Sequence, residues 1–327
     1  MSNKDNIFEE KLKQELSVKL LDLEGLRIKY SNNKKYIIVL YIIISLVLYY
    51  VAIVLFNLPF FAIIWCIAMS FVLNRFIIEP KFFNNSGIYE YIKKEILETA
   101  FKLYDNNLAY HSLNGFSEQT FDESLIPKFS YNNFKSEDMI KGKVDDTTIS
   151  MSEINAWYRS KNSSHTIFKG ILLKAQLNFN IEGYFVIRAK EKNELLAAFR
   201  GVASNLLQDI FNIDKSDLKE YTDIKDEHLK NDFEIYSSHS FIAESILTPD
   251  FIDNFTEFNK FDYPLSISFI NNQFYAAGTN KNDFLEIDMT KSLKNLTNVD
   301  EEIMPFIKLL RTIKLLDIQG AAKRISK

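Results

Sequence analysis

The hydrophobic pattern divides the chain into an N-terminal apolar block and a longer remainder in which short apolar runs alternate with polar residues. From Tyr36 to Asn74 no residue is Asp, Glu, Lys, Arg or His, although 25% of the whole chain is charged. The hydrocarbon core of a bilayer excludes charge at a cost of about 2.5–3.5 kcal/mol for a Lys, Arg or Asp at the centre of a span. The pattern therefore predicts a membrane-embedded segment over 36–78.

The apolar block is too long for one span and fits two. Residues 36–56 would form about 31 Å of helix and residues 60–78 about 28 Å, each close to the thickness of the hydrocarbon core. Asn57-Leu58-Pro59 lies between them, where a turn is expected and where proline is tolerated at a helix start. We predict a transmembrane helical hairpin; the alternatives are one long span and two buried helices of a soluble core.

Basic residues flank the apolar block on both sides and are absent from its central turn. They are Lys19, Arg27, Lys29, Lys34 and Lys35 before the block, Arg75 near the end of the second span, and Lys81, Lys93 and Lys94 after it. Because positively charged flanks stay cytoplasmic, both termini are expected in the cytoplasm. A signal peptide does not fit, since the apolar run is long and follows a charged segment.

Amphipathic helices are expected on both sides of the block. Residues 1–35 carry leucines at three- and four-residue spacing on one face, namely Leu12, Leu16, Leu20, Leu23 and Leu26. This cytoplasmic helix could pack on the soluble domain, pair with a second copy or lie at the membrane surface; Glu9 and Lys19 fall on its seam and disfavour a coiled coil. Residues 79–125 are predicted as a membrane-proximal helix, Ile88–Tyr104, followed by a linker.

After residue 126 the apolar period changes to two, which is typical of strands. Strands are expected at 128–134, 139–144, 147–153, 155–159, 168–178 and 183–187. No crossover helix has room to form between most of them, so an antiparallel meander follows. Asp145-Asp146 is expected as a hairpin turn.

The C-terminal part mixes strands and helices. The pattern predicts a helix or linker at 191–211, an exposed connection at 214–230, a strand at 233–237, a helix at 241–258 broken near Thr248-Pro249, a hairpin of 265–270 and 273–278 across Asn271-Asn272, and a closing helix at 299–317. The predicted fold class is α+β: a two-helix transmembrane hairpin followed by a cytoplasmic domain over 126–320 with antiparallel sheet and flanking helices. That domain could divide into two subdomains near 212–231.

Composition excludes several kinds of chemistry. A net charge of −4 argues against a nucleic-acid binder, and a single cysteine argues against a disulfide framework or a cysteine-rich metal site. The four histidines lack metal-ligand spacing, and the nine glycines form no phosphate or dinucleotide loop. We therefore expect no metal, no cofactor and no identifiable catalytic residue. A loop between two predicted strands, with Asn162, His165 and Lys169, is the candidate interaction site.

Five short motifs in the second half of the chain carry a family resemblance. They are Glu137-Asp138-Met139-Ile140-Lys141-Gly142-Lys143, Ser152-Glu153-Ile154-Asn155-Ala156, His165-Thr166-Ile167-Phe168-Lys169-Gly170, Ile235-Tyr236-Ser237 and Ile246-Leu247-Thr248-Pro249. In this order they resemble the DUF3137 family of uncharacterised bacterial membrane proteins, over most of residues 85–318. Phe179–Ile187 departs from that family, which is usually more basic there. The resemblance implies a multi-pass protein of the bacterial cytoplasmic membrane and a protein partner, such as a LemA-like membrane protein, and it implies no catalytic residues.

These observations favour a membrane-anchored cytoplasmic scaffold or sensor that binds a partner protein, a lipid headgroup or a small ligand. A membrane-tethered enzyme is one alternative, because an active site needs residues that are close in space rather than in sequence. A subunit of an oligomeric channel or transporter is another.

Overall fold

The computed structural model describes residues 3–56, 68, 70–72, 85–161, 164–190, 218–259, 264–279, 284–294 and 297–326. The chain forms two compact units: unit 1 is Met1–Ala100 with Ile287–Asp300, and unit 2 is Phe101–Glu286 with Glu301–Lys327. A segment from near the C-terminus therefore completes the N-terminal unit. Unit 2 begins earlier in the chain than the predicted domain at 126–320.

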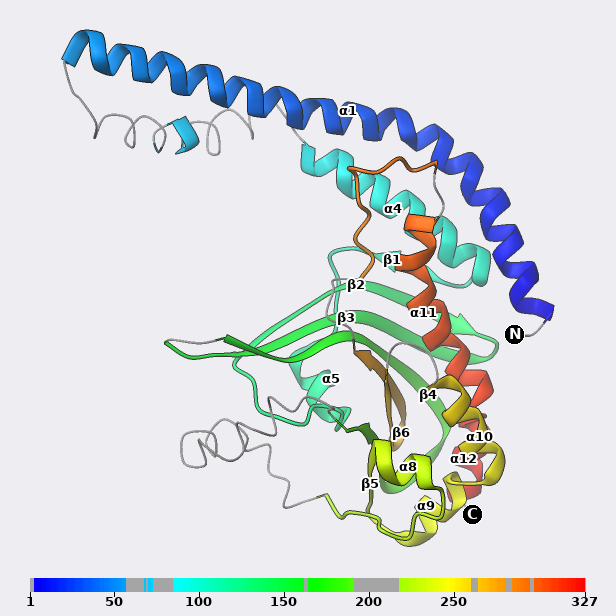
Figure 1. The fold of residues 1–327 in the computed structure, drawn as a ribbon. Coiled ribbons are helices and arrows are strands. Elements are labelled where there is room, and N and C mark those ends of the chain that lie inside the picture. The colour runs from blue at the N-terminus through cyan, green and yellow to red at the C-terminus, as the bar shows by residue number, and fades with distance from the viewer. Residues whose placement is uncertain are drawn as a thin grey trace. The chain divides into compact units, whose positions relative to one another are not determined.

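Unit 1 is built on one long helix. Helix α1 (Asn3–Phe56) runs from the charged N-terminal segment directly into the apolar block, and α4 (Asn85–Tyr104) follows it (Figure 1). No glycine or proline separates the predicted cytoplasmic helix from the predicted first span, so the two are continuous. Of the predicted second span, only residues 68 and 70–72 are described, and the turn at 57–59 lies outside the described residues. Among the described residues, one helix is long and apolar enough to be a candidate span, and the hairpin stays a prediction.

Unit 2 is an α+β unit around an antiparallel sheet, as the sequence predicts. The strands have the order β1-β2-β3-β4-β5, and β6 also pairs with β4. They are β1 (Ala109–His111), β2 (Asn133–Val144), β3 (Thr147–Arg159), β4 (Ser164–Ala189), β5 (Phe233–Ser237) and β6 (Leu265–Thr279). β4 is the centre of the sheet, because three strands pair with it.

The strands are fewer and longer than predicted. β3 joins the two predicted strands at 147–153 and 155–159, and β4 joins those at 168–178 and 183–187. Bulges occur where the sequence pattern predicts breaks between strands: the pairing of β4 with β6 shifts register twice near Ile181, and neither strand ends there. The Asp145-Asp146 turn is confirmed, since Val144 pairs with Thr147 and Asp145 has a φ of 49°.

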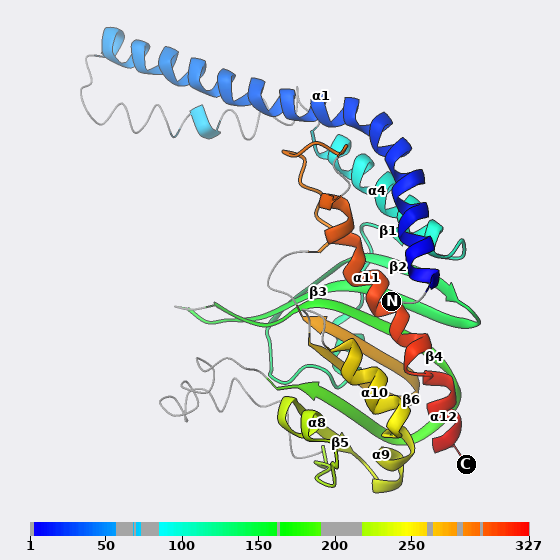
Figure 2. The ribbon, with the colours of Figure 1, turned by 45° about the vertical axis from the view of Figure 1, so that its right-hand side comes forward.

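The predicted hairpin across Asn271-Asn272 is wrong. Both halves of β6 pair with β4, so the chain continues through these residues as one strand (Figure 2). Asn271 has a φ of 54°, and Gly183 on the facing stretch of β4 has a φ of 127°. Residues that favour a turn here form bulges, which bend two paired strands together.

The helices of unit 2 agree with the predicted pattern more closely. They are α5 (Glu118–Glu123), α8 (Glu227–Asp232), α9 (Ser240–Ile246), α10 (Pro249–Phe258), α11 (Thr297–Leu315, which begins in unit 1) and α12 (Ile318–Ile325). The break near Thr248-Pro249 is confirmed: the Thr248 hydroxyl caps α10 by accepting a bond of 3.3 Å from the amide of Phe251. Residues 105–125, predicted as a linker, supply β1 and α5. The predicted helix at 191–211 lies outside the described residues.

Two sets of contacts hold the sheet of unit 2 in place: an apolar cluster around α5, and hydrogen bonds from α12 to the bent part of β4 near Gln176. Phe121 of α5 is fully buried, with its ring centroid 5.0 Å from that of Phe168, and belongs to a cluster with Ile126, Ile154, Ala156, Phe168, Leu172, Tyr275 and Ala277. Burying such a side chain contributes about 1.5–3 kcal/mol. At the bend, Gln319 of α12 donates to the carbonyl of Gln176 (2.9 Å) and accepts from the amide of Asn178 (2.9 Å).

Gly170 provides a test of this packing. It lies on β4 opposite Thr279, and a methyl group at Gly170 would overlap the carbonyl oxygen of Gly278. Gly170→Ala is expected to lower the free energy of unfolding by roughly 1–3 kcal/mol, measured by thermal unfolding. Gly25→Ala is the control, because a Cβ there meets nothing within 4 Å and alanine favours a helix. Equal midpoints for Gly170→Ala and the parent would contradict the packing.

Candidate functional site

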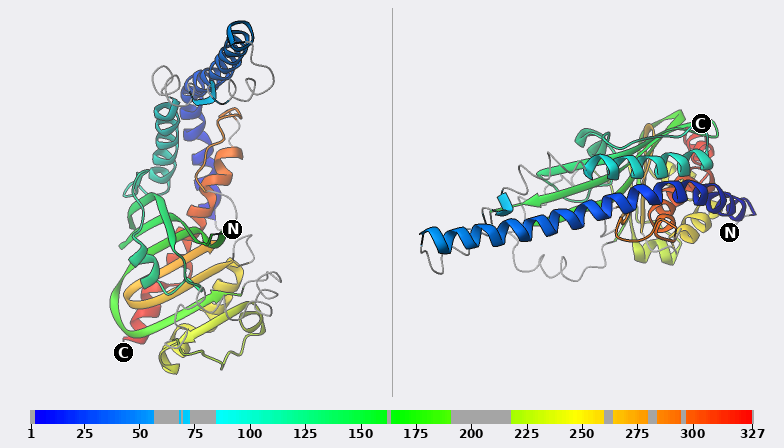
Figure 3. Two further views of the ribbon diagram at one scale, coloured as in Figure 1. Left: turned by 90° about the vertical axis from the view of Figure 1, so that its left-hand side faces the viewer. Right: turned by 90° about the horizontal axis from the view of Figure 1, so that it is seen from above.

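In unit 1, α1 and α4 form an antiparallel pair. The two helices lie side by side (Figure 3). Lys19 forms an ion pair with Glu95, and the ring centroid of Tyr30 lies 6.3 Å from that of Tyr89. The buried leucines of α1, Leu16, Leu20 and Leu23, fall on the same face as Lys19 and Tyr30 by helical spacing. Further along α1, the hydroxyl oxygen of Ser45 lies 2.7 Å from that of Ser70. As the residue number on α1 rises from 19 to 30 to 45, the number of its partner falls from 95 to 89 to 70, which is the pattern of an antiparallel pair.

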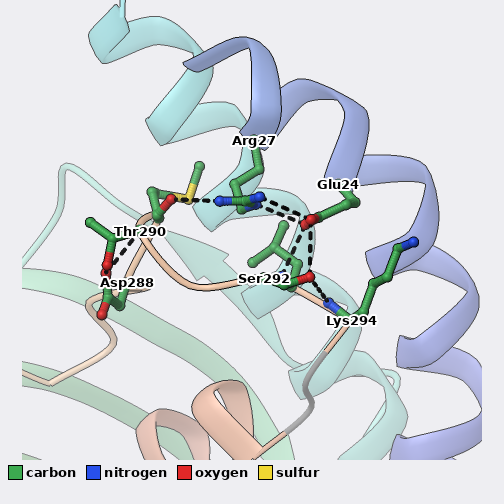
Figure 4. A network of polar contacts seen from close by, with 8 residues as sticks. Glu24, Arg27, Asp288, Thr290, Ser292 and Lys294 are labelled. Atoms are coloured by element: carbon green, nitrogen blue, oxygen red, sulfur yellow. Dashed lines mark hydrogen bonds and ion pairs between the residues drawn. The ribbon is translucent and has the colours of Figure 1, made fainter. Parts of the chain in front are cut away.

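A buried carboxylate ties α1 to the segment 287–294. Glu24 accepts hydrogen bonds from Arg27 Nε (2.8 Å) and Nη2 (3.0 Å), from the Ser292 hydroxyl (3.0 Å) and from the Leu293 amide (3.0 Å) (Figure 4). Arg27 Nη1 donates to the carbonyl of Met289 (3.1 Å). We call these five residues the Glu24 latch. Each bond to a charged group is worth more than a neutral one, so the latch holds the segment firmly.

The electrostatics of the latch favour an ionised Glu24. Burial alone would raise the pKa of Glu24, but the bonds from Arg27, the Leu293 amide and Ser292 outweigh it, and the pKa is lowered. Beside the latch, the hydroxyl and amide of Thr290 lower the pKa of Asp288. The latch therefore needs no added proton or ion to balance its charges at neutral pH.

The latch was not predicted from the sequence. Its partners are separated by 268 residues between Glu24 and Ser292, and no local motif joins them. One signal was available: Glu24 follows Leu20 by four residues and Leu23 by one, so it lies beside the apolar face of an amphipathic helix. A carboxylate in that position requires a partner.

The predicted interaction loop is the end of the β3–β4 hairpin. His165 is exposed and pairs with Tyr158, whereas Lys169 is half-buried and pairs with Asn155. One extra residue on β4 between Phe168 and Thr166 shifts the register, which places His165 and Lys169 on opposite faces of the sheet. Asn162 lies outside the described residues. A partner seated on one face would contact one of the two side chains, not both.

A second charged cluster lies in unit 2, where Arg188 is 3% exposed. Its Nε (2.9 Å) and Nη2 (2.5 Å) donate to the carbonyl of Leu125, and its guanidinium lies 5.3 Å from the ring centroid of Tyr236. Burial lowers the pKa of Arg188 and raises the pKa of Tyr236 to about 12. Tyr236 donates to Glu234, which also pairs with Lys128 at 2.8 Å. These contacts fix the loop at Leu125.

Neither unit presents an assembled reaction centre within the described ranges. No three His, Cys, Asp or Glu side chains there could hold a metal ion. The cavity between α10, α11 and the sheet holds about 30 Å³ and is lined by Ile171, Phe258, Leu265, Gly278, Phe284, Pro305, Lys308 and Leu309. Ligand pockets are usually about ten times larger.

Comparison with known families gives a match that includes parts of both units. Residues 166–317, from β4 to the end of α11, match the family model described as "Protein of unknown function (DUF3137)". This segment belongs to the DUF3137 family. The region that matches DUF3137 contains most of unit 2, including Arg188, and the part of the Glu24 latch at 287–294. Helices α1 and α4 precede this region in the chain.

Other comparisons add little. No curated protein matches the chain. Among solved structures, the crystal structure of the mycobacterial trehalose monomycolate transport factor A, TtfA, matches with 8% sequence identity and a TM-score of 0.29 over 62% of this chain and 87% of that one. A likeness of that size carries no argument about fold or function.

Proposed function

We propose that this DUF3137 protein is a membrane-anchored scaffold or sensor. In this proposal residues 36–56 and 60–78 cross a bacterial cytoplasmic membrane as a helical hairpin. Both termini and unit 2 lie in the cytoplasm, where unit 2 binds a partner protein, a lipid headgroup or a small ligand. Two features of unit 1 support the anchor, and the lack of an assembled reaction centre in the described residues favours a binding role.

The first support is the length and exposure of α1. The segment Gln14–Val51 is long and apolar enough to cross a bilayer, and none of its most apolar window is buried. A core helix of a soluble protein would be covered, whereas a spanning helix exposes its side chains to lipid.

The second support, which carries the proposal, is the antiparallel register of unit 1. The midpoints of the pairs Lys19–Glu95, Tyr30–Tyr89 and Ser45–Ser70 all fall between residues 57 and 60. The same antiparallel pairing thus continues from the polar half of α1 into the apolar block, and it predicts that the chain turns back at Asn57-Leu58-Pro59. A chain that leaves near Tyr30 and returns near Tyr89 crosses a bilayer an even number of times.

Single-cysteine labelling tests the topology. In a Cys66→Ala background, Glu15→Cys, Asn57→Cys and Ser326→Cys report the N-terminal helix, the turn and the C-terminal end. We expect an impermeant maleimide to label Asn57→Cys on intact cells, and the other two only after lysis, because both flanks of a hairpin share one side. Carbonate extraction should leave all three proteins in the membrane.

Two outcomes would overturn the anchor. Recovery of the chain in the supernatant would remove the membrane assignment. Labelling of Ser326→Cys and Asn57→Cys together on intact cells would replace the hairpin by a single span. A partner is then sought by crosslinking in membranes; a LemA-like membrane protein is the class that the family resemblance proposes.

A further inference from the structure

The polar half of α1 has an exposed apolar stripe that faces away from α4. Val18, Leu21 and Ile28 are 62%, 57% and 45% exposed, at spacings of three and seven residues on one face. This part of the helix precedes the apolar block, so lipid tails do not explain their exposure. Large exposed apolar side chains in a contiguous row indicate a contact surface.

The opposite face of α1 is already occupied. Leu16, Leu20 and Leu23 are buried there, and Lys19 pairs with Glu95 of α4. Glu24 is held by the latch. The stripe is therefore a separate surface, not an extension of the contact with α4.

The stripe has the pattern of a parallel two-stranded coiled coil. Its six exposed positions repeat at spacings of four, three, four, three and four residues: Gln14, Val18, Leu21, Gly25, Ile28 and Asn32. None is charged, in a stretch that contains three acidic and three basic residues, Glu15, Asp22, Glu24, Lys19, Arg27 and Lys29. One core position holds Val18, Gly25 and Asn32, and the other holds Gln14, Leu21 and Ile28. Of these, the pairing of Val18 with Leu21 and the single Asn beside Val18 in its set are features of parallel dimers with a fixed register.

We infer that a second copy of this chain packs against the stripe, so that two α1 helices pair in parallel. The parallel direction rests on the proposed function, since two copies anchored in one bilayer share their orientation. Each stripe residue then faces its own equivalent, which accounts for the absence of charge at the six positions from Gln14 to Asn32, because a charged residue there would face a like charge. At the same spacings the next position after Asn32 is Lys35, where the uncharged stripe ends, and the positions beyond it in the apolar block are Val39, Ile42 and Leu46, which are exposed.

A lipid surface fits the stripe less well. Helices that lie on anionic membranes are rich in Lys and Arg on their polar face. Here acidic and basic residues balance over 14–32, and the acidic Glu15 and Asp22 are exposed beside the stripe. The charge pattern thus favours a protein surface of the same composition.

Disulfide crosslinking of the full chain in membranes tests the pairing. In the Cys66→Ala background, Leu21→Cys and Ile28→Cys are expected to form disulfide-linked dimers under mild oxidation, because a disulfide requires Cβ atoms about 3.5–4.5 Å apart. Lys34→Cys, exposed on the opposite side of α1, is the control and should stay monomeric. Adding Leu21→Glu to Ile28→Cys should abolish the dimer by placing like charges at the seam.

The outcomes separate this inference from the membrane anchor. Crosslinking at 21 and 28 but not at 34 supports the pair, and equal crosslinking at all three positions overturns it. Monomeric protein in the membrane fraction also overturns the pair and leaves the anchor intact. Protein in the supernatant overturns the anchor, and crosslinking at 21 and 28 still decides the pair. Protection of both cysteines from maleimide only when anionic vesicles are added, without dimers, assigns the stripe to lipid and overturns the pair.

Discussion

Glu24→Gln is expected to release the segment 287–294 from α1. The substitution keeps the shape of the side chain but removes its charge, which leaves Arg27 partly buried without its carboxylate and weakens the bonds from Ser292 and Leu293. Loss of hydrogen bonds to a charged group of this kind costs about 2–3 kcal/mol. Protection of the Leu293 amide against hydrogen exchange should therefore fall about 30- to 150-fold, since 1.4 kcal/mol corresponds to a factor of ten.

Asp22→Asn is the matched control for the latch. Asp22 is exposed on the same helix two residues away and carries the same charge, so a general effect of charge on α1 would change both variants alike. Unchanged protection of Leu293 in Glu24→Gln would show that the latch does not hold the segment.

The latch also predicts a direction of pH dependence. Because the pKa of Glu24 is lowered in the folded protein, its contribution to stability is present above the ordinary glutamate value of about 4.3 and is lost as the pH falls through the lowered pKa. Protection of Leu293, corrected for the intrinsic exchange rate, should therefore be constant from pH 5 to 7 and should decrease below about pH 4. Glu24→Gln should lack this decrease.

Arg188→Met is expected to destabilise unit 2. The change removes both donors to the Leu125 carbonyl, and Leu125 itself has the unfavourable φ of 53°. An unsatisfied buried carbonyl costs about 1–3 kcal/mol, and the packing on Tyr236 is altered as well. We expect the thermal midpoint to fall by about 2–12 °C, at roughly 2–4 °C per kcal/mol for a domain of this size.

Arg159→Met controls for the loss of a positive charge. Arg159 is exposed at the end of β3, and substitutions at such positions usually change stability by less than about 0.5 kcal/mol. Comparable losses in Arg159→Met and Arg188→Met would contradict the role assigned to Arg188.

The sequence predicted local structure better than the contacts between distant segments. The period of the apolar residues located β5, the break before α10 and the Asp145-Asp146 turn, because each depends on a few neighbouring residues. Asn271 is locally indistinguishable from a turn residue. Its role depends on the facing strand β4, which continues past Asn271 and has a bulge near Gly183, so that both halves of β6 pair with β4.

The candidate sites show the same limit. His165 and Lys169 are four residues apart on one strand, which places them on one face unless a bulge intervenes; a single extra residue on β4 separates them. The Glu24 latch depends on a contact across 268 residues, for which the local pattern offers only an acid beside an apolar face. Burial patterns identify which positions need partners, whereas the fold determines which partners they receive.

The discontinuity of unit 1 has a consequence for biogenesis. Translation proceeds at about 5–20 residues per second, so Ser292 leaves the ribosome on the order of 15–50 s after Glu24. Throughout that interval the carboxylate on the nascent helix lacks two of its native donors. Unit 1 is thus begun first and completed nearly last, and a chain truncated before residue 287 would contain α1 but lack the segment 287–294 that binds Glu24.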